Sequence, residues 1–178
     1  MEDRIYIAVG SNIDPEPNVL QALELLMREL SVTASSTFYW SAPAERPDQD
    51  PFRNGVWQVQ STLTPREIKF DVLRPIEHQL GRRREKDSHA ARTIDLDLAL
   101  HGELRVAEED LQLPDPDIPK RAFLWQPLAE LAGGTLASLG CGPLPQALES
   151  LDPNHQITER LRSVLDSSPG HPRRKAES

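Results

Sequence analysis

Hydrophobic residues recur with two different periods along the first hundred positions of the chain. Four segments alternate apolar and polar side chains, a pattern typical of a half-buried β-strand: residues 5–9, 32–41, 54–63 and 92–98. Two other segments carry apolar side chains at helical spacing. The first helix is predicted to begin at Pro17. The second follows a capping box at residues 64–67 and ends at Gly81, because glycine readily terminates a helix.

These elements follow one another as strand, helix, strand, strand, helix, strand. The order predicts an α+β fold, a ferredoxin-like βαββαβ sandwich with a C-terminal extension of short helices. Two of those short helices are expected near residues 144–151 and 156–165. We therefore expect a single domain over residues 1–165. Residues 166–178 have few apolar side chains to bury, and a disordered tail is predicted there.

The segment 92–98 carries the strongest chemical signal. Asp95 and Asp97 alternate with leucine and isoleucine, so a strand would place both carboxylates on one face, roughly 7 Å apart. Two carboxylates this close repel each other unless a cation lies between them, and aspartate is a poor strand former. The simpler alternative is a solvated edge strand with its polar residues outward. A metal site gains support from nearby arginines: Arg82, Arg83, Arg84 and Arg92.

These parts together indicate magnesium-dependent phosphoryl or nucleotidyl transfer. A nucleoside triphosphate carries dense negative charge, which Mg²⁺ held by one or two carboxylates offsets. Arginine side chains then stabilise the charge that develops on the phosphates during transfer. The residues by themselves do not identify the molecule that accepts the transferred group.

Composition narrows the class of protein further. The chain has 178 residues, 38% of them hydrophobic, which suits one ordinary core. Its formal charge of −8 disfavours nucleic-acid binding, since phosphate backbones select basic surfaces. The single cysteine, Cys141, excludes an internal disulfide. Because no long apolar run and no signal peptide is evident, we expect a cytoplasmic protein that does not bind membranes; its oligomeric state is open, with a monomer favoured.

Several short motifs follow one another between about residue 5 and residue 131. They are Gly-Ser-Asn at 10–12, Phe-Tyr-Trp-Ser-Ala-Pro at 38–43, Asn54, Glu77, Gly-Arg-Arg-Arg at 81–84, Arg-Thr-Ile-Asp-Leu-Asp at 92–97 and Arg-Ala-Phe at 121–123. This ordered set resembles the 6-hydroxymethyl-7,8-dihydropterin pyrophosphokinases of folate biosynthesis. The resemblance implies that ATP and a hydroxymethyldihydropterin are the substrates. The hydroxymethyl oxygen would attack the β-phosphorus of ATP, so that the diphosphoryl group moves intact and AMP leaves.

The resemblance also implies roles for individual side chains. Asp95 and Asp97 match the ligands of two Mg²⁺ ions, and together with Arg82 and Arg92 they form the expected catalytic set. The expected ATP contacts are Arg84, His89, Arg92, Leu98, Asp115 and Arg121. The expected pterin contacts are Ser41, Ala42, Ala44, Phe52, Asn54 and Phe123.

The pterin contacts suit a flat heterocycle. Asn54 can donate and accept hydrogen bonds at once, and Phe52 and Phe123 would stack on the two faces of the ring. Each also has a plainer interpretation. The two phenylalanines are alternatively core residues, and Asn54 is alternatively a turn residue before a strand.

Three positions depart from the pattern of the family. His89 stands where a tryptophan often covers the substrates, and Ala90-Ala91 replaces Gly-Pro. Asp115 stands where a histidine is usual, and an aspartate repels phosphate unless a metal intervenes. Two alternatives therefore stay open: a diverged pyrophosphokinase acting on a related pterin, and a non-catalytic protein that binds pterin or nucleotide.

Overall fold

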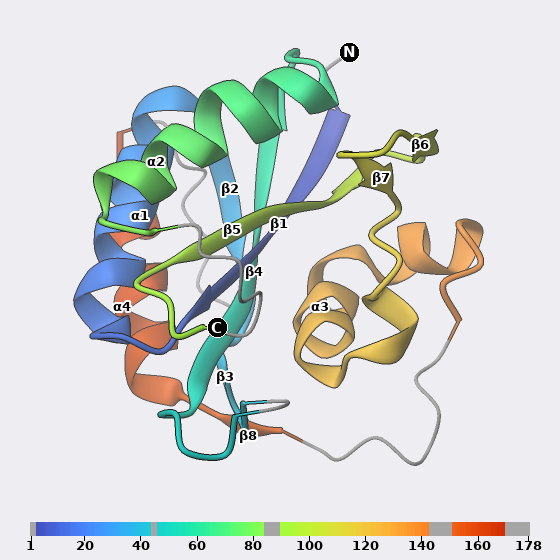
Figure 1. Cartoon of the computed structure of the whole chain (residues 1–178). Coiled ribbons are helices and arrows are strands. Elements are labelled where there is room, and N and C mark those ends of the chain that lie inside the picture. Colours follow the sequence, from blue (N-terminus) through green and yellow to red (C-terminus); the bar gives the residue numbers. More distant parts are fainter. Residues whose placement is uncertain (1–2, 44–45, 84–89, 143–150, 170–178) are drawn as a thin grey trace, which may run out of the picture.

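The computed structural model describes residues 3–43, 46–83, 90–142 and 151–169, which form an antiparallel sheet with helices on both faces (Figure 1). The strands of this sheet are β1 (Asp3–Ser11), β2 (Ser31–Ser35), β3 (Tyr39–Ser41), β4 (Phe52–Ser61), β5 (Asp95–His101) and β8 (Asp152–Pro153). The helices are α1 (Pro15–Glu29), the π-helix η1 (Glu67–Leu73), α2 (Arg74–Gln79), the 3₁₀-helix η2 (Ile118–Lys120), α3 (Ala122–Ser138) and α4 (His155–Asp166). Strands β6 (Val106–Ala107) and β7 (Gln112–Leu113) pair separately. The predicted combination of one sheet with packed helices is confirmed, and the sheet is antiparallel.

The strand order brings distant parts of the sequence into one row. Strand β1 lies between β5 and β4, and β4 also pairs with β2 and β3. In this register Gly10 of β1 is opposite Asp95 of β5 on one side and Asn54 of β4 on the other. Residues that are opposite each other in an antiparallel pair share a face of the sheet. The sheet therefore carries Asp95 and Asn54 on one face, separated by a single glycine.

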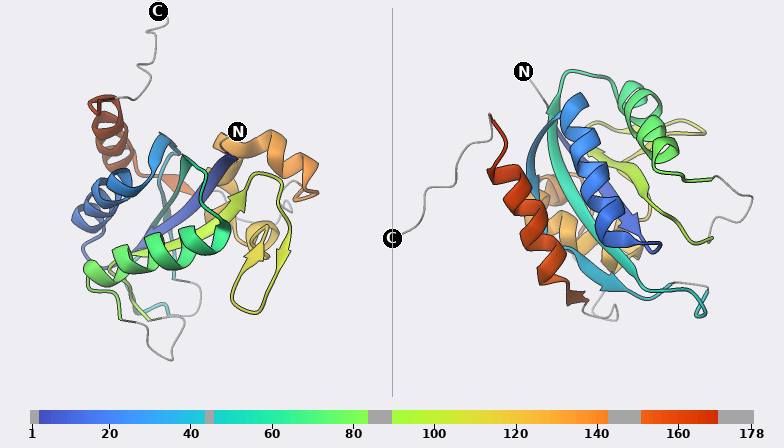
Figure 2. Two further views of the ribbon diagram at one scale, coloured as in Figure 1. Left: turned by 90° about the horizontal axis from the view of Figure 1, so that it is seen from above. Right: turned by 90° about the vertical axis from the view of Figure 1, so that its left-hand side faces the viewer.

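Two hydrophobic layers lie on the two faces of the sheet. Helices α1, α2 and α4 cover one face and α3 covers the other (Figures 1 and 2). Along β1, Ile5, Ile7 and Val9 enter the larger core beneath α1, whereas Tyr6 and Ala8 face α3. This is the alternation that the sequence predicts for residues 5–9.

The segment 32–41, predicted as one strand, forms two strands instead. Between β2 and β3 the chain turns toward α4. There the Phe38 N–H donates to Thr158 Oγ1 at 2.9 Å, and the Phe38 carbonyl accepts from the Asn154 N–H at 2.7 Å. A helix 120 positions away in the sequence supplies these partners, so the local pattern does not reveal the break.

The second predicted helix is confirmed at its start but is not uniform. Its capping box forms, because the Thr64 N–H donates to Glu67 Oε2 at 2.7 Å and the Glu67 N–H donates to Thr64 Oγ1 at 3.3 Å. The first part, η1, then has π geometry, and the Arg74 N–H bonds the carbonyl of Lys69 five residues back. Pro75 follows at once and has no N–H to donate, which disfavours continuous α-helix there.

The remaining boundaries differ by a few residues. Helix α1 begins at Pro15 rather than Pro17, because Asp14 just before it has φ 40° and starts the turn. The helix predicted over 156–165 is α4, whereas the one predicted over 144–151 lies outside the described residues. Of the predicted tail, Asp166 ends α4 and residues 170–178 lie outside the described part. In the described ranges, the helices are all too short or too polar to cross a lipid bilayer.

Gly55 allows β4 to pass directly over the ring of Phe38. A Cβ at position 55 would lie 2.3 Å from Phe38 Cε2, closer than carbon atoms approach without a shift of one of them. Phe38 is fully buried and packs against Trp57, with ring centroids 6.2 Å apart. The ring therefore has no free space into which it could withdraw.

We predict that Gly55→Ala lowers the free energy of unfolding by about 1–3 kcal/mol through overpacking at Phe38. Gly134→Ala is the matched control. It lies in α3 with nothing within 4 Å of the added Cβ, and alanine favours helix, so it should not destabilise the protein. Urea denaturation of both variants measures the difference, and equal stability for the two would contradict the prediction.

Candidate active site

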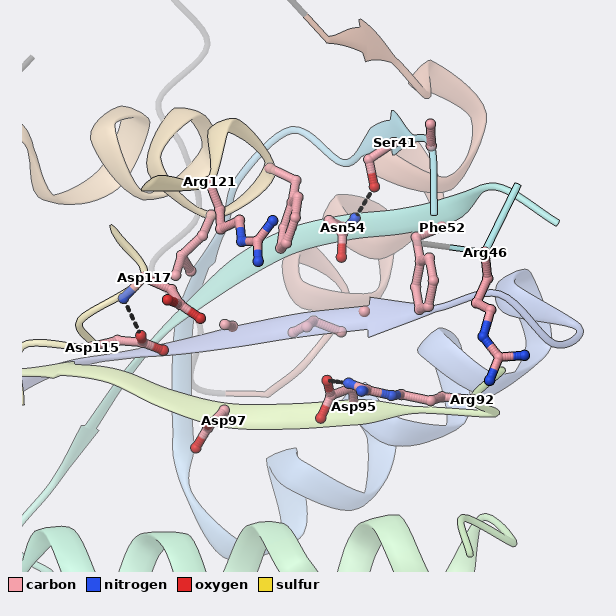
Figure 3. A pocket seen from close by; sticks show the side chains of 17 residues that line it. Ser41, Arg46, Phe52, Asn54, Arg92, Asp95, Asp97, Asp115, Asp117 and Arg121 are labelled. Atoms are coloured by element: carbon pink, nitrogen blue, oxygen red, sulfur yellow. Dashed lines mark hydrogen bonds and ion pairs between the residues drawn. The ribbon is translucent and has the colours of Figure 1, made fainter. Parts of the chain in front are cut away.

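A pocket of roughly 410 Å³ lies on the α3 face of the sheet (Figure 3). It is formed by β1, β4 and β5, by the loops that follow β3 and β7, and by the start of α3. The lining residues that matter for chemistry are Ser41, Arg46, Phe52, Asn54, Arg92, Asp95, Asp97, Asp115, Asp117, Arg121 and Phe123. Most of the residues singled out from the sequence therefore converge at one place.

Asp95 opens β5 and lies between two guanidinium groups. Its carboxylate accepts hydrogen bonds from Arg82 Nη1 and from Arg92 Nη1. Burial by itself would raise the pKa of Asp95, but the two positive charges outweigh it and hold the pKa below its ordinary value. Asp95 is therefore a carboxylate at neutral pH.

Glu77 on α2 holds Arg82 from the side opposite Asp95. It is only 2% exposed, accepts the Leu96 N–H of β5 at 2.8 Å, and bonds the same Arg82 nitrogen that reaches Asp95. Through these contacts Glu77 orients Arg82. The buried carboxylate of Glu77 on one side and the half-buried carboxylate of Asp95 on the other leave the Arg82 guanidinium little freedom to turn.

Asp97 shares the pocket face with Asp95 but has different partners. One of its oxygens accepts the Leu98 N–H at 2.9 Å and lies 3.4 Å from Lys69 Nζ of η1. Figure 3 shows Asp97 turned away from Arg92, with Asp95 beside that arginine. Strand β5 is an edge strand, yet both acids line the pocket, so the solvated-strand alternative describes only part of their surroundings.

The side of the pocket near β7 is acidic. The Asp117 N–H donates to Asp115 Oδ1 at 2.8 Å, and the Asp115 N–H donates to the Ala99 carbonyl at 3.0 Å. Burial raises the pKa of Asp115 to about 6, and the negative charges of Asp97 and Asp117 act in the same direction. Asp115 therefore keeps its proton to a higher pH than an ordinary aspartate. The protonated form carries no charge and would not repel phosphate.

The expected pterin contacts gather on the opposite side of the pocket. Asn54 is 8% exposed, and its Nδ2 donates to Ser41 Oγ. Its carbonyl oxygen lies against Gly10, where a Cβ would come within 2.8 Å, so a side chain at position 10 would displace the amide. Asn54 lies inside β4 and is therefore not a turn residue. Phe52 and Phe123 are half-buried and line the pocket, which distinguishes them from fully buried core aromatics.

Some predicted site residues lie elsewhere. The Leu98 side chain is 2% exposed and belongs to the core on the other face of the sheet, so only its backbone is available to a ligand. Arg82 reaches the pocket through Asp95 and also lines a second cavity beside α2. Ala44, Arg84 and His89 lie outside the described residues.

The contacts of Ser11 and Asn12 link the Gly-Ser-Asn motif at 10–12 to the segment that carries Arg92. Asn12 Oδ1 accepts the Arg92 N–H at 2.7 Å, while its Nδ2 donates to Gln49 Oε1 and to the Asp50 carbonyl, both at 3.2 Å. Ser11 Oγ donates to the Thr93 carbonyl at 2.6 Å. The end of β1 thus holds the chain that carries Arg92 against the loop before β4.

Two charged residues near the acids were missed by the sequence reasoning. Arg46 lines the pocket from the loop after β3, and Lys69 pairs with Asp97. Arg46 lies in a proline-rich loop without periodicity, so no pattern signals its direction. Lys69 precedes the buried Val72, Leu73 and Ile76 by three, four and seven residues, so it lies on the inward face of this helix, but that spacing does not identify its partner.

The donor set suits a hard divalent cation that is shared with a ligand. Asp95 and Asp97 offer carboxylate oxygens, the ligands that Mg²⁺ prefers. Within the described ranges, no cluster of three or more His, Cys, Asp or Glu could hold a metal by itself. Oxygens of a bound phosphate would have to complete the coordination.

Carboxylates and arginines beside a half-apolar pocket define the class of protein: one built to bind a phosphorylated ligand next to a flat organic group. Comparison with known proteins agrees. Residues 6–133 match the family model of 7,8-dihydro-6-hydroxymethylpterin-pyrophosphokinase (HPPK). The chain belongs to this family.

Curated relatives support the assignment. The 2-amino-4-hydroxy-6-hydroxymethyldihydropteridine pyrophosphokinases of Bacillus subtilis and Pseudomonas aeruginosa are both 37% identical to the chain. The alignments cover 74% of this chain and 79% and 82% of those proteins, respectively. The "Folic acid synthesis protein fol1" of Pneumocystis carinii is 34% identical over 133 residues, but the chain spans only 18% of that longer protein.

We predict that Asn12→Ala lowers the free energy of unfolding by about 2–3 kcal/mol, because it removes three hydrogen bonds of a buried side chain. The amide of Arg92 should also exchange with solvent faster. Asn18→Ala is the matched control, since Asn18 makes one exposed bond to the Ile13 carbonyl. Hydrogen exchange and urea denaturation measure both effects, and equal losses in the two variants would contradict the prediction.

We predict that Asp115→Asn stabilises the protein in a pH-dependent way. The folded-state pKa of about 6 lies above the ordinary 3.8, so the folded state binds the proton more tightly. Stability therefore falls as pH rises from about 4 to 6, and the full penalty persists above that range. Asparagine keeps the acceptor for the Asp117 N–H and has no charge. The gain should be about 2 kcal/mol at pH 8 and small at pH 4; an equal gain at both would contradict it.

Proposed function

We propose that this protein transfers the diphosphoryl group of ATP to the hydroxymethyl group of 6-hydroxymethyl-7,8-dihydropterin, releasing AMP, in folate biosynthesis. The observation that carries the proposal is the row Asp95–Gly10–Asn54 across three strands. It joins a charged half-pocket and an amide-and-aromatic half-pocket on one face, in a chain of the HPPK family. A phosphate donor and a flat acceptor would meet over Gly10.

The acceptor side suits a pterin. Asn54 offers one donor and one acceptor, which matches a ring edge carrying both kinds of group. Its amide is held by Ser41, so its direction is set before a ligand arrives. Phe52 and Phe123 offer aromatic faces for stacking. Backbone groups of Ser41 and Ala42, which also line the pocket, are available for further hydrogen bonds to the ring.

The donor side suits a triphosphate. In the proposed reaction the hydroxymethyl oxygen loses its proton and bonds to the β-phosphorus. The bond from that phosphorus to the oxygen bridging the α-phosphorus breaks, and AMP leaves with that oxygen. Arg92 and Arg121 line the pocket, and Arg82 lies behind Asp95. These guanidinium groups would bind the phosphates and stabilise the charge that develops as the diphosphoryl group moves.

We propose two Mg²⁺ ions, held between the phosphates and the carboxylates of Asp95 and Asp97. When bound, Mg²⁺ neutralises triphosphate charge and orients the attacked phosphorus. Asp95 would hold the metal with a carboxylate that Arg82 and Arg92 already bond. The fold we propose is ferredoxin-like, on the strand order β5-β1-β4 with β2 and β3 beyond it. We also propose a cytoplasmic location and a monomeric state.

Asp115 is the observation that favours a second candidate function: a diverged or non-catalytic member of the family. A carboxyl group in the phosphate half of the pocket, with Asp97 and Asp117 near it, opposes binding of a polyanion. A protein that binds the pterin alone would not be affected by that repulsion. A related pterin as acceptor is equally compatible with Asn54 and the two phenylalanines.

We predict that the purified protein forms AMP and the diphosphorylated pterin in equal amounts from ATP, Mg²⁺ and 6-hydroxymethyl-7,8-dihydropterin. Asp95→Asn and Asp97→Asn should each lower kcat at least about 100-fold, because a lost metal ligand cannot be replaced by binding elsewhere. Chromatography of the nucleotides and pterins measures both. Asp71→Asn, at an exposed position on η1, is the control that should retain activity.

The outcomes separate the candidates. Absence of AMP above background, with pterin binding unchanged in Asp95→Asn, would contradict the catalytic proposal and favour a binding protein. Faster turnover with another pterin in a substrate panel would keep the reaction and change the acceptor.

A further inference from the structure

Lys69 is a cation directed at one of the two acids from outside the pocket. It lies on η1, and its Nζ is 3.4 Å from Asp97 Oδ1. The Lys69 side chain is only 14% exposed, although a lysine on a helix surface usually extends into solvent. Lys69 precedes the buried Val72, Leu73 and Ile76 by three, four and seven residues, so it lies on the inward face of this helix. From that face its ammonium reaches the edge strand β5.

The two acids of β5 are neutralised in different ways. Asp95 is bonded by two guanidinium groups, one of which is held in turn by the buried Glu77. Asp97 meets a single ammonium at a distance longer than an ideal charged hydrogen bond. An ammonium on a flexible stem exchanges partners more readily than a guanidinium fixed by two carboxylates. The Asp97–Lys69 pair is therefore the one that a second cation can open.

Lys69 also acts on the acidic side of the pocket. Its charge opposes the rise in the pKa of Asp115, which burial and the charge of Asp97 cause. In the described part of the chain, it is the only cation within salt-bridge distance of Asp97. Removing Lys69 would leave the repulsion between Asp97 and Asp115 with less positive charge to oppose it.

We propose that Lys69 is a positioning residue that competes with the divalent cation for Asp97 and so sets the metal concentration that the site requires. The proposal rests on the proposed function, because it takes Asp97 as a metal ligand. Without metal, Lys69 holds the carboxylate toward η1 and away from Asp95. When the metal and nucleotide bind, Asp97 turns from the ammonium to the metal, and the remaining positive charge of Lys69 weakens the metal's hold.

The sign of this effect is unusual and makes it testable. Loss of a residue that merely supports the site weakens metal binding, whereas loss of a competing cation strengthens it. A unit charge about 6 Å from a divalent ion in water-like surroundings changes the affinity about tenfold. We therefore expect Lys69→Met to bind Mn²⁺ about tenfold more tightly than the unaltered protein.

The experiment measures free Mn²⁺ by electron paramagnetic resonance at pH 8, with α,β-methylene-ATP at saturation and no pterin. This analogue has a methylene group in place of the oxygen whose bond breaks, so binding is measured without turnover. Lys69→Arg keeps the charge and should restore Mn²⁺ affinity to within about threefold of the unaltered protein. The Mg²⁺ concentration that half-maximally raises Tm provides a second readout, with Lys69→Gln as the alternative variant if Lys69→Met does not fold.

Lys120→Met is the matched control. Lys120 pairs with Asp117, which also lines the pocket, at 3.9 Å, but that pair is exposed and does not include Asp97. The control removes the same charge near the same pocket and should leave the affinity for Mn²⁺ within about twofold of the unaltered protein.

Each outcome bears on a defined claim. Unchanged or weaker Mn²⁺ binding in Lys69→Met, beside normal binding in the unaltered protein, overturns the proposal and leaves the proposed function intact. Weaker nucleotide binding with unchanged Mn²⁺ affinity also overturns it, since Lys69 would then contact phosphate. If the unaltered protein binds neither Mn²⁺ nor the analogue, the proposed function itself fails.

Discussion

The charge network around Asp95 is the interaction on which the rest of the site depends. A mostly buried carboxylate between Arg82 and Arg92, with Glu77 behind it, ties α2, the segment before β5 and β5 itself together. Buried ion pairs contribute little net stability, because desolvation offsets their attraction. Their value here is geometric. With these partners bonded, the guanidinium groups are held in place, and the charged half of the pocket is formed before any ligand binds.

A second constraint is the absence of a side chain at Gly10, where β1 lies between β4 and β5. Gly10 separates Asp95 from Asn54 in one row of the sheet, and its lack of a side chain leaves room for the Asn54 amide. The charged half and the amide half of the pocket therefore share one floor. Because Ser11 and Asn12 continue from the same glycine and bond the segment around Arg92, one short motif sets both the floor and one wall.

Asp115 and Lys69 carry opposite charges beside the acids of β5. The carboxyl group of Asp115 lines the pocket, and the ammonium of Lys69 approaches Asp97 from η1. The charge of Lys69 offsets part of the negative charge on this side of the pocket. If Asp97 holds a metal as proposed, the balance between Lys69 and the acids sets how readily metal and nucleotide bind.

The sequence by itself determined the alternation of residues 5–9, the capping box at Thr64 and the acids on one face of β5, because these features depend on local periodicity and residue type. That Asp95, Asn54 and Phe52 belong to one site was implied by the resemblance to a family, and the pocket agrees with it. Only the tertiary structure decided that residues 32–41 split into two strands, that Leu98 points into the core, and that Lys69 meets Asp97. Each of these depends on partners supplied by distant segments, and the period of a strand or helix carries no information about what will pack beside it.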